Sequence, residues 1–283
     1  MFPTEKYSLL AAAVRGVGVP AERFGGPDLV LDSDLRRVHT PEYLADLAAA
    51  RATGRTLSSE LPVTRAVIDG FRRMVGGTTR AADLAWGEER FTMHLGGGFH
   101  HAFPDHAEGF CYYHDVAIAI RRLQATAGLG RVAVVDTDLH QGNGTAAIFA
   151  GDDSVFTFSI HQERLYPLKQ RSDLDIGLDL FVGDAEYLDR LDEALDRVYE
   201  GFSPEMVFHV SGADPYLDDQ LGDLKLPIEG LRERDRRVIG RAAALGIPGV
   251  VTLAGGYARR VEDTVRIHLG TAEAVWATYG GGE

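Results

Sequence analysis

The chain has 283 residues, of which 45% are hydrophobic and 25% charged, a composition typical of globular proteins. Its formal net charge of -13 is opposite in sign to the basic surface of nucleic-acid-binding proteins, so no direct nucleic-acid partner is expected. The single cysteine, Cys111, excludes an internal disulfide, and neither a membrane-spanning apolar stretch nor a secretory signal is evident. We therefore expect a cytoplasmic protein with one domain over residues 1–283.

Short apolar runs alternate with longer helical patterns along the chain. The first predicted helix has Thr40 as its N-cap and Pro41 in its first turn, and is expected to end near Gly54. Strands are predicted over 90–95, 131–136, 155–160, 206–211 and 249–254, and further helices over 113–127, 187–199, 229–245 and 261–279. Because the strand runs are almost continuously apolar, they suit a buried parallel sheet. The pattern predicts an α/β fold with a central, mainly parallel sheet flanked by helices on both faces.

Side chains that titrate or bind metals directly follow four of the predicted strands. In open parallel sheets, ligands bind beyond the carboxyl ends of the strands. We therefore expect these side chains to meet at one edge of the sheet, where neighbouring glycines permit tight turns. In chain order they are His100 and His101, then Asp136, Asp138, His140 and Asn143, then Asp214, and finally Tyr257.

Asp138, His140 and Asp214 are the candidate metal ligands. A catalytic zinc ion takes three protein ligands and keeps one position open for water. Side chains two residues apart at an extended strand end point to the same side, as Asp138 and His140 would, and Asp214 follows another strand. Taken alone, an Asp-x-His motif more often marks a helix cap or a buried structural histidine. The convergence of several strand ends favours the metal site.

The adjacent His100 and His101 are candidates for proton transfer, because imidazole titrates near neutral pH. A histidine base is usually oriented by an acceptor at its other ring nitrogen, a role open to Asp136 and Asn143. Tyr257 follows two glycines and is a candidate hydrogen-bond donor to an oxyanion. The alternatives are an exposed histidine pair and a tyrosine that merely packs over the sheet end.

Several long motifs occur in a fixed order: GGGFHHAFPDHAEGFCYY, VVDTDLHQGNG, HVSGADPY with DDQLGDLKL, and LAGGY. They resemble the successive signatures of the histone deacetylase superfamily. The opening FPTEKYSLL is similar to shorter, class IV-like bacterial members, and the resemblance extends from Phe2 through the last predicted helix. It implies the arginase/deacetylase-like fold and a zinc-dependent hydrolase of linear amide bonds. The implied substrate is a lysine side chain that carries an acetyl or longer acyl group.

The resemblance also implies roles for individual residues. It makes His101 the general base, paired with Asn143, and His100 its electrostatically tuned neighbour, paired with Asp136. Tyr257 would polarise the scissile carbonyl. The implied zinc ligands are Asp138, His140 and Asp214. The substrate channel is implied to contain Gly109, Phe110 and Gly255, with Leu221 near its rim. A monovalent-cation site, usually for potassium, is implied at Asp136, Asp138, His140, Ser159 and Ile160.

One position departs from many members of the superfamily, which carry Asp where this chain has Asn143. A neutral amide stabilises an imidazolium ion less than a carboxylate does. We therefore expect a lower pKa for His101 than in the Asp-bearing members.

Other functions are compatible with some of these candidate residues. Small acylated amines such as acetylpolyamines are alternative substrates. A non-catalytic reader of acylated lysine would have lost part of this residue set, whereas an arginase-like dimetal hydrolase would need more metal ligands than the motifs supply.

The charged segment 161–184 follows a strand end and is expected to form a lip over the active site.

Overall fold

The computed structural model describes residues 4–280; residues 1–3 and 281–283, and with them Phe2, lie outside the described part. Within residues 4–280, six strands form a single sheet in the order β1-β6-β5-β2-β3-β4, and every pairing is parallel. The strands are β1 Phe91–Met93, β2 Val132–Asp136, β3 Val155–Gln162, β4 Leu174–Leu178, β5 Met206–Val210 and β6 Gly249–Thr252. The predicted parallel α/β fold is confirmed.

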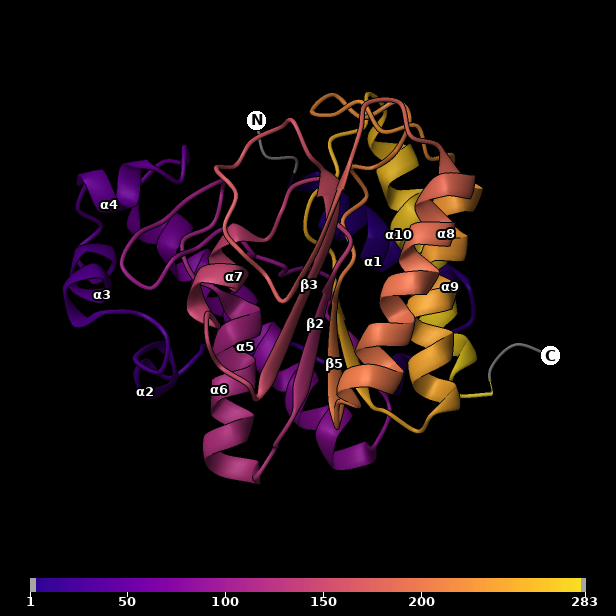
Figure 1. Cartoon of the computed structure of the whole chain (residues 1–283). Helices are drawn as coiled ribbons and strands as arrows, with labels where there is room; N and C mark the ends of the chain where they lie inside the picture. Colours follow the sequence, from indigo (N-terminus) through magenta and orange to yellow (C-terminus); the bar gives the residue numbers. More distant parts are fainter. Residues whose placement is uncertain (1–3, 281–283) are drawn as a thin grey trace.

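Helices cover both faces of the sheet (Figure 1). On one side lie α5 Arg65–Glu88, α6 Asp115–Ala127 and the short α7 Asn143–Ile148. On the other side lie α1 Glu5–Gly16, α8 Asp184–Asp196, α9 Ile228–Ala244 and α10 Val261–Ala277. The short helices α2 Asp32–Leu35, α3 Pro41–Ala48 and α4 Gly54–Leu57 extend the α5 side. A 3-10 turn, Ala21–Arg23, and a π-helical turn, Arg197–Phe202, complete the helical elements of this part of the chain.

The central strands alternate their side chains between two apolar cores. In β2, Val134 belongs to the core beneath α5 and α6, and the next residue, Val135, belongs to the core beneath α8 and α9. The adjacent strand β5 repeats this alternation with Phe208 and Val207. Because successive strand residues point to opposite faces, two helical layers require apolar side chains at every position. This explains why β2 and β5 are buried throughout.

The predicted helices are present, with shifted ends. Thr40 caps α3 by accepting a hydrogen bond from the Tyr43 backbone at Oγ1, as predicted, but α3 ends at Ala48 and not near Gly54. The helix expected over 187–199 begins earlier, at Asp184, and passes into the π-helical turn. None of the helices within residues 4–280 combines the length and the apolarity that crossing a bilayer requires.

The longest helix, α5, is absent from the sequence-based prediction. Its centre carries Gly76, Gly77, Thr78 and Thr79, which all have low helix propensity. The glycines are required by close packing: a Cβ on Gly76 would lie 1.8 Å from the backbone oxygen of Asp28, and one on Gly77 would lie 2.3 Å from Nε2 of His94. Tertiary packing therefore overrides local propensity in this helix.

The expectation of a lip over 161–184 holds only for its first part. Tyr166 lines the pocket described below. Leu174–Leu178, in contrast, forms β4, which pairs with β3 at the edge of the sheet. This strand alternates between partly buried and exposed residues, as an edge strand with one covered face does, so a search for continuously apolar runs misses it.

Candidate active site

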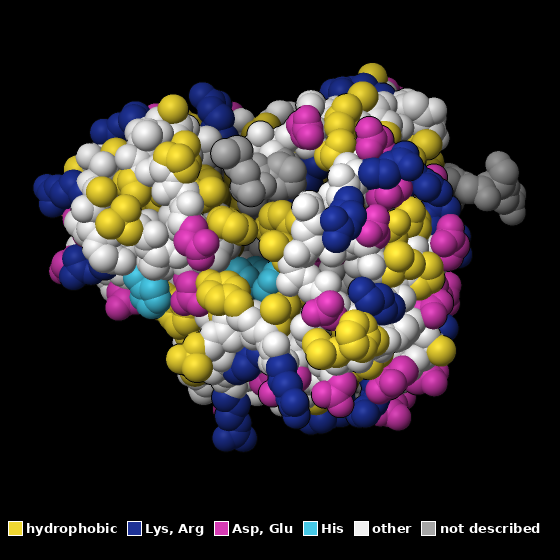
Figure 2. All heavy atoms as spheres, turned by 90° about the horizontal axis from the view of Figure 1, so that it is seen from above, with side chains coloured by type: hydrophobic (Ala, Val, Ile, Leu, Met, Phe, Trp, Pro, Cys, Tyr) yellow, Lys and Arg dark blue, Asp and Glu magenta, His cyan; other side chains and the backbone are white. Residues whose placement is uncertain are grey.

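A pocket of about 230 Å³ opens beyond the carboxyl ends of the strands. Figure 2, which looks down on this edge, shows histidine side chains at the bottom of a hollow that hydrophobic and acidic side chains border. The structure brings the predicted chemical groups together here. Those that line the pocket are His100, His101, Asp138, His140, Asp214 and Tyr257.

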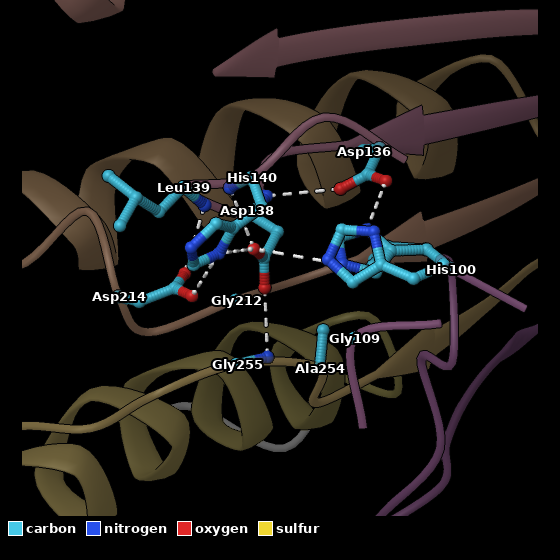
Figure 3. A network of polar contacts seen from close by, with 12 residues as sticks. His100, Gly109, Asp136, Asp138, Leu139, His140, Gly212, Asp214, Ala254 and Gly255 are labelled. Atoms are coloured by element: carbon cyan, nitrogen blue, oxygen red, sulfur yellow. Dashed lines mark hydrogen bonds and ion pairs between the residues drawn. The ribbon is translucent and has the colours of Figure 1, made fainter. Parts of the chain in front are cut away.

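The metal-binding candidates Asp138, His140 and Asp214 offer one ligand atom each, and these atoms lie within 4.8 Å of one another (Figure 3). They meet because β2, which precedes Asp138 and His140, lies beside β5, which precedes Asp214. Burial and the neighbouring charge of Asp138 raise the pKa of Asp214. Within the described chain, Oδ2 of Asp214 is buried and accepts no well-aligned hydrogen bond, and the nearest donor, Nδ1 of His140, lies 3.3 Å away. Two buried carboxylates with an unsatisfied oxygen and an imidazole fit a divalent cation such as zinc.

Backbone amides hold these ligands in place. Leu139 N donates to Oδ1 of Asp214 at 2.9 Å, and Gly255 N donates to Oδ2 of Asp138 at 2.8 Å. A Cβ on Gly255 would lie 2.1 Å from Oδ2 of Asp214, so the close approach requires glycine at this position. Such contacts around the ligands fix their orientation before any ion binds.

The two histidines have different acceptors at Nδ1. Nδ1 of His100 lies 2.7 Å from Oδ2 of Asp136, and Nδ1 of His101 lies 2.8 Å from Oδ1 of Asn143. Burial alone would lower the pKa of His100, but the carboxylates of Asp136 and Asp138 outweigh it and raise that pKa to about 9. Burial and the charges of His100 and His140 hold the pKa of His101 well below its usual value. The pair thus combines a protonated and a neutral imidazole at neutral pH.

The candidate channel residues also line the pocket. Gly109 and Phe110 both have positive φ, 48° and 63°, and a Cβ on Gly109 would lie 2.5 Å from Cδ2 of His101. The centroids of the Phe110 and Tyr257 rings lie 6.0 Å apart, and Leu221 on the pocket wall is exposed. Burial raises the pKa of Tyr257 well above its usual value, with Asp214 and Asp138 adding to the effect. Its hydroxyl therefore keeps its proton and can donate a hydrogen bond.

The residues expected to bind a monovalent cation lie on, or directly after, the adjacent strands β2 and β3. Asp136 and Ser159 are register partners in the β2–β3 pair, and Ile160 follows Ser159. Asp138 and His140 continue the chain from the end of β2. The strand pairing thus brings the five residues to one region, and the bound ion itself stays a prediction.

Three further residues contact this site and are absent from the sequence-based prediction. Lys6 in α1 is buried and donates to the backbone oxygens of Ala254 at 2.8 Å and Gly255 at 3.2 Å. Glu108 accepts a hydrogen bond from Asn143. Arg234 in α9, also fully buried, lies behind the metal ligands. All three are distant in sequence from their partners. For Lys6 and Arg234, a charged residue in a helix usually indicates a solvent-facing position, so the sequence gives no sign of their burial.

Comparison with known proteins identifies the family to which this chain belongs. The sequence model of the histone deacetylase domain matches residues 1–271. An uncharacterized protein of Picosynechococcus sp. is 38% identical, covering 94% of this chain and 90% of that protein. Histone deacetylase 2 of Arabidopsis thaliana is 33% identical over 82% of this chain, which spans 64% of the plant protein.

Among solved structures, acetylpolyamine aminohydrolase from Burkholderia pseudomallei superposes with a TM-score of 0.83 at 24% identity. The match covers 97% of this chain and 90% of that one, and supports the predicted deacetylase-like fold. On the family match and the shared sequence, the chain belongs to the histone deacetylase domain family.

Proposed function

We propose that this chain is a zinc-dependent amidohydrolase that removes acyl groups from lysine side chains. The observation that carries the proposal is the joint presence in one pocket of three candidate metal ligands, two oriented imidazoles and a buried tyrosine hydroxyl. A non-catalytic reader would not need this complete set.

Asp138, His140 and Asp214 would hold the zinc ion. When bound, the ion supplies Lewis acidity, which polarises an acyl carbonyl and makes a neighbouring water molecule more acidic. The backbone amides of Gly255 and Leu139, which donate to Asp138 and Asp214, restrict the two carboxylates to fixed positions and thereby select the place of the ion.

The remaining residues act on the substrate and its protons. His101 donates through Nδ1 to Asn143, which leaves Nε2 free to take a proton from the attacking water. Tyr257 donates a hydrogen bond to the oxygen that gains negative charge. The carbon–nitrogen bond then breaks, and a protonated histidine passes a proton to the departing amine. The products are a carboxylate and a free amine.

The proposal also names the substrate, by its acyl group and by the amine that is released. The favoured substrate is acetyl- or longer acyl-lysine in a peptide or protein, whose side chain fits a narrow pocket between Phe110 and Tyr257. Acetylpolyamines are the second candidate, favoured by the net charge of -13, which attracts small cations.

We also propose that potassium binds at the β2–β3 region and that the protein is located in the cytoplasm. Flame photometry of the purified protein and cell fractionation test these two parts.

The deciding experiment measures deacylation of peptides carrying acetyl- to myristoyl-lysine and of acetylated polyamines, with metal-free and zinc-restored protein side by side. Turnover that depends on zinc supports the proposal, and the preferred compound identifies the substrate class. A His101→Ala variant is the control for contaminating hydrolases, because it should bind zinc without turnover. Stoichiometric zinc binding without hydrolysis of any compound would contradict the proposal and revive the reader hypothesis.

A further inference from the structure

The amide of Asn143 creates an orientation problem that an aspartate would not have. An amide has an acceptor oxygen on one side and a donor NH₂ group on the other, whereas the two oxygens of a carboxylate are equivalent. Only the oxygen can accept from Nδ1–H of His101 and leave Nε2 as the free base. With the NH₂ group in its place, the imidazole would have to present Nδ1 as the acceptor, and Nε2 would carry the proton.

Two contacts orient the amide in the structure. Oδ1 of Asn143 accepts from His101 Nδ1 at 2.8 Å and from Gly144 N at 3.0 Å. On the other side, Nδ2 donates to Oε1 of Glu108 at 3.0 Å. Asn143 is only 1% exposed, so without Glu108 its NH₂ group would lose this partner in a place that water hardly reaches.

The same carboxylate oxygen holds a second residue over the site. The Tyr166 hydroxyl donates to Oε1 of Glu108 at 3.0 Å. The Tyr166 ring meets the His101 ring edge-on, with 5.5 Å between the ring centres. The side chain of Glu108 is 20% exposed, and its other oxygen, Oε2, lies 3.7 Å from Nε2 of His106. The next residue in the chain, Gly109, lines the pocket. Glu108 therefore joins Asn143, which bonds to His101, to Tyr166, whose ring packs against His101.

We propose that Glu108 is a positioning residue for the general base. It fixes the Asn143 amide with its oxygen toward His101, and it places a carboxylate one hydrogen bond behind this neutral amide. The inference rests on the proposed amidohydrolase function, because it assigns His101 the role of base. It also explains how an asparagine serves at this position: an acceptor on Glu108, 35 residues away in sequence, keeps the amide in the orientation that His101 requires.

The first test compares kcat and KM of single variants in zinc-loaded protein. Glu108→Ala should lower kcat by about tenfold and change KM little, since residues that orient a catalytic group affect the chemical step. Glu108→Gln should recover most of the activity, because its amide oxygen can still accept from Asn143. Asp105→Ala is the matched control, because it removes a negative charge from the same segment but leaves both hydrogen bonds to Oε1 of Glu108 in place. Asp105 is bonded to His106, which lies 3.7 Å from Oε2 of Glu108, so this variant also tests whether that weaker contact matters. Equal losses in Glu108→Ala and Asp105→Ala would overturn the proposal.

The second test repeats Glu108→Ala in an Asn143→Asp background. A carboxylate at position 143 needs no orientation and would be repelled by Glu108. Removal of Glu108 should therefore leave kcat unchanged or raise it there, although it lowers kcat in the native background. A merely structural role for Glu108 predicts the same loss in both backgrounds, and that result would contradict the proposal.

A third readout needs no turnover. Nitrogen NMR of histidine-labelled protein reports which ring nitrogen of His101 carries the proton, with the signal assigned by its loss in His101→Ala. The native protein should show the Nδ1–H form, and Glu108→Ala should show a second population with the proton on Nε2. An unchanged tautomer in Glu108→Ala would overturn the inference. Because this measurement is independent of substrate, it separates a failure of the inference from a failure of the proposed function.

Discussion

The guanidinium of Arg234 is fully buried between α9 and the two loops that carry the candidate metal ligands. It donates to Oδ1 of Asp235 at 2.8 Å, and to the backbone oxygens of Thr137 at 3.2 Å and Gly212 at 2.6 Å. These two carbonyls precede Asp138 by one residue and Asp214 by two residues. We therefore expect Arg234→Met to weaken both the fold and metal binding.

The size of the effect on folding follows from the burial of the pair. Removing one partner of a buried ion pair costs about 3–5 kcal/mol, because the other charge stays buried without compensation. In a domain with a free energy of unfolding of about 5–15 kcal/mol, this is a large fraction. At roughly 2–4 °C per kcal/mol for a domain of this size class, the melting temperature should fall by about 6–20 °C.

Urea denaturation of metal-free protein measures the first effect, and competition with a chelator for zinc measures the second. Arg234→Met combined with Asp235→Leu is the informative second variant. Loss of both charges should restore part of the stability, since apolar replacement of a buried ion pair is often neutral. The carbonyls of Thr137 and Gly212 would still lack their donor, so zinc affinity should stay about 10–100-fold reduced. The reasoning is refuted if the single variant loses less than about 1 kcal/mol, or if the double variant binds zinc like the native protein.

Two further predictions concern Tyr257 and Lys6. Tyr257→Phe should lower kcat by about 100-fold or more, as loss of an oxyanion donor does, while zinc affinity in chelator competition stays unchanged; equal losses in both would defeat the assigned role. Burial lowers the pKa of Lys6 from 10.5 to about 8. Between these values the unfolded chain binds a proton that the folded chain has released, so folding becomes more favourable as the pH rises. In metal-free protein, the free energy of unfolding of the native chain relative to Lys6→Met should therefore increase from pH 8 to 10.5, and a flat difference would contradict the shift.

The sequence by itself was sufficient for strands β1, β2, β3, β5 and β6, although not for β4, and for the candidate ligands. Strands β2 and β5 are buried on both faces, so each is an apolar run in the sequence. The ligand-type residues follow those runs directly, and the rule that parallel strands present their carboxyl ends at one edge brings Asp138 and Asp214 together. Local information was enough because these residues are placed by the strand that precedes them.

Only the tertiary structure decided the elements and contacts whose cause is remote in sequence. Helix α5 contains the poor helix formers Gly76 and Gly77 because neighbouring segments pack against their backbone. Lys6 is bonded to Ala254, 248 residues away, and nothing in the sequence around Lys6 indicates that partner. Glu108 likewise contacts Asn143, which is 35 residues away in sequence. The physical reason is the same in each case. The burial of a polar group and the identity of its partner depend on the segments that pack around it, and the local sequence does not show which segments these are.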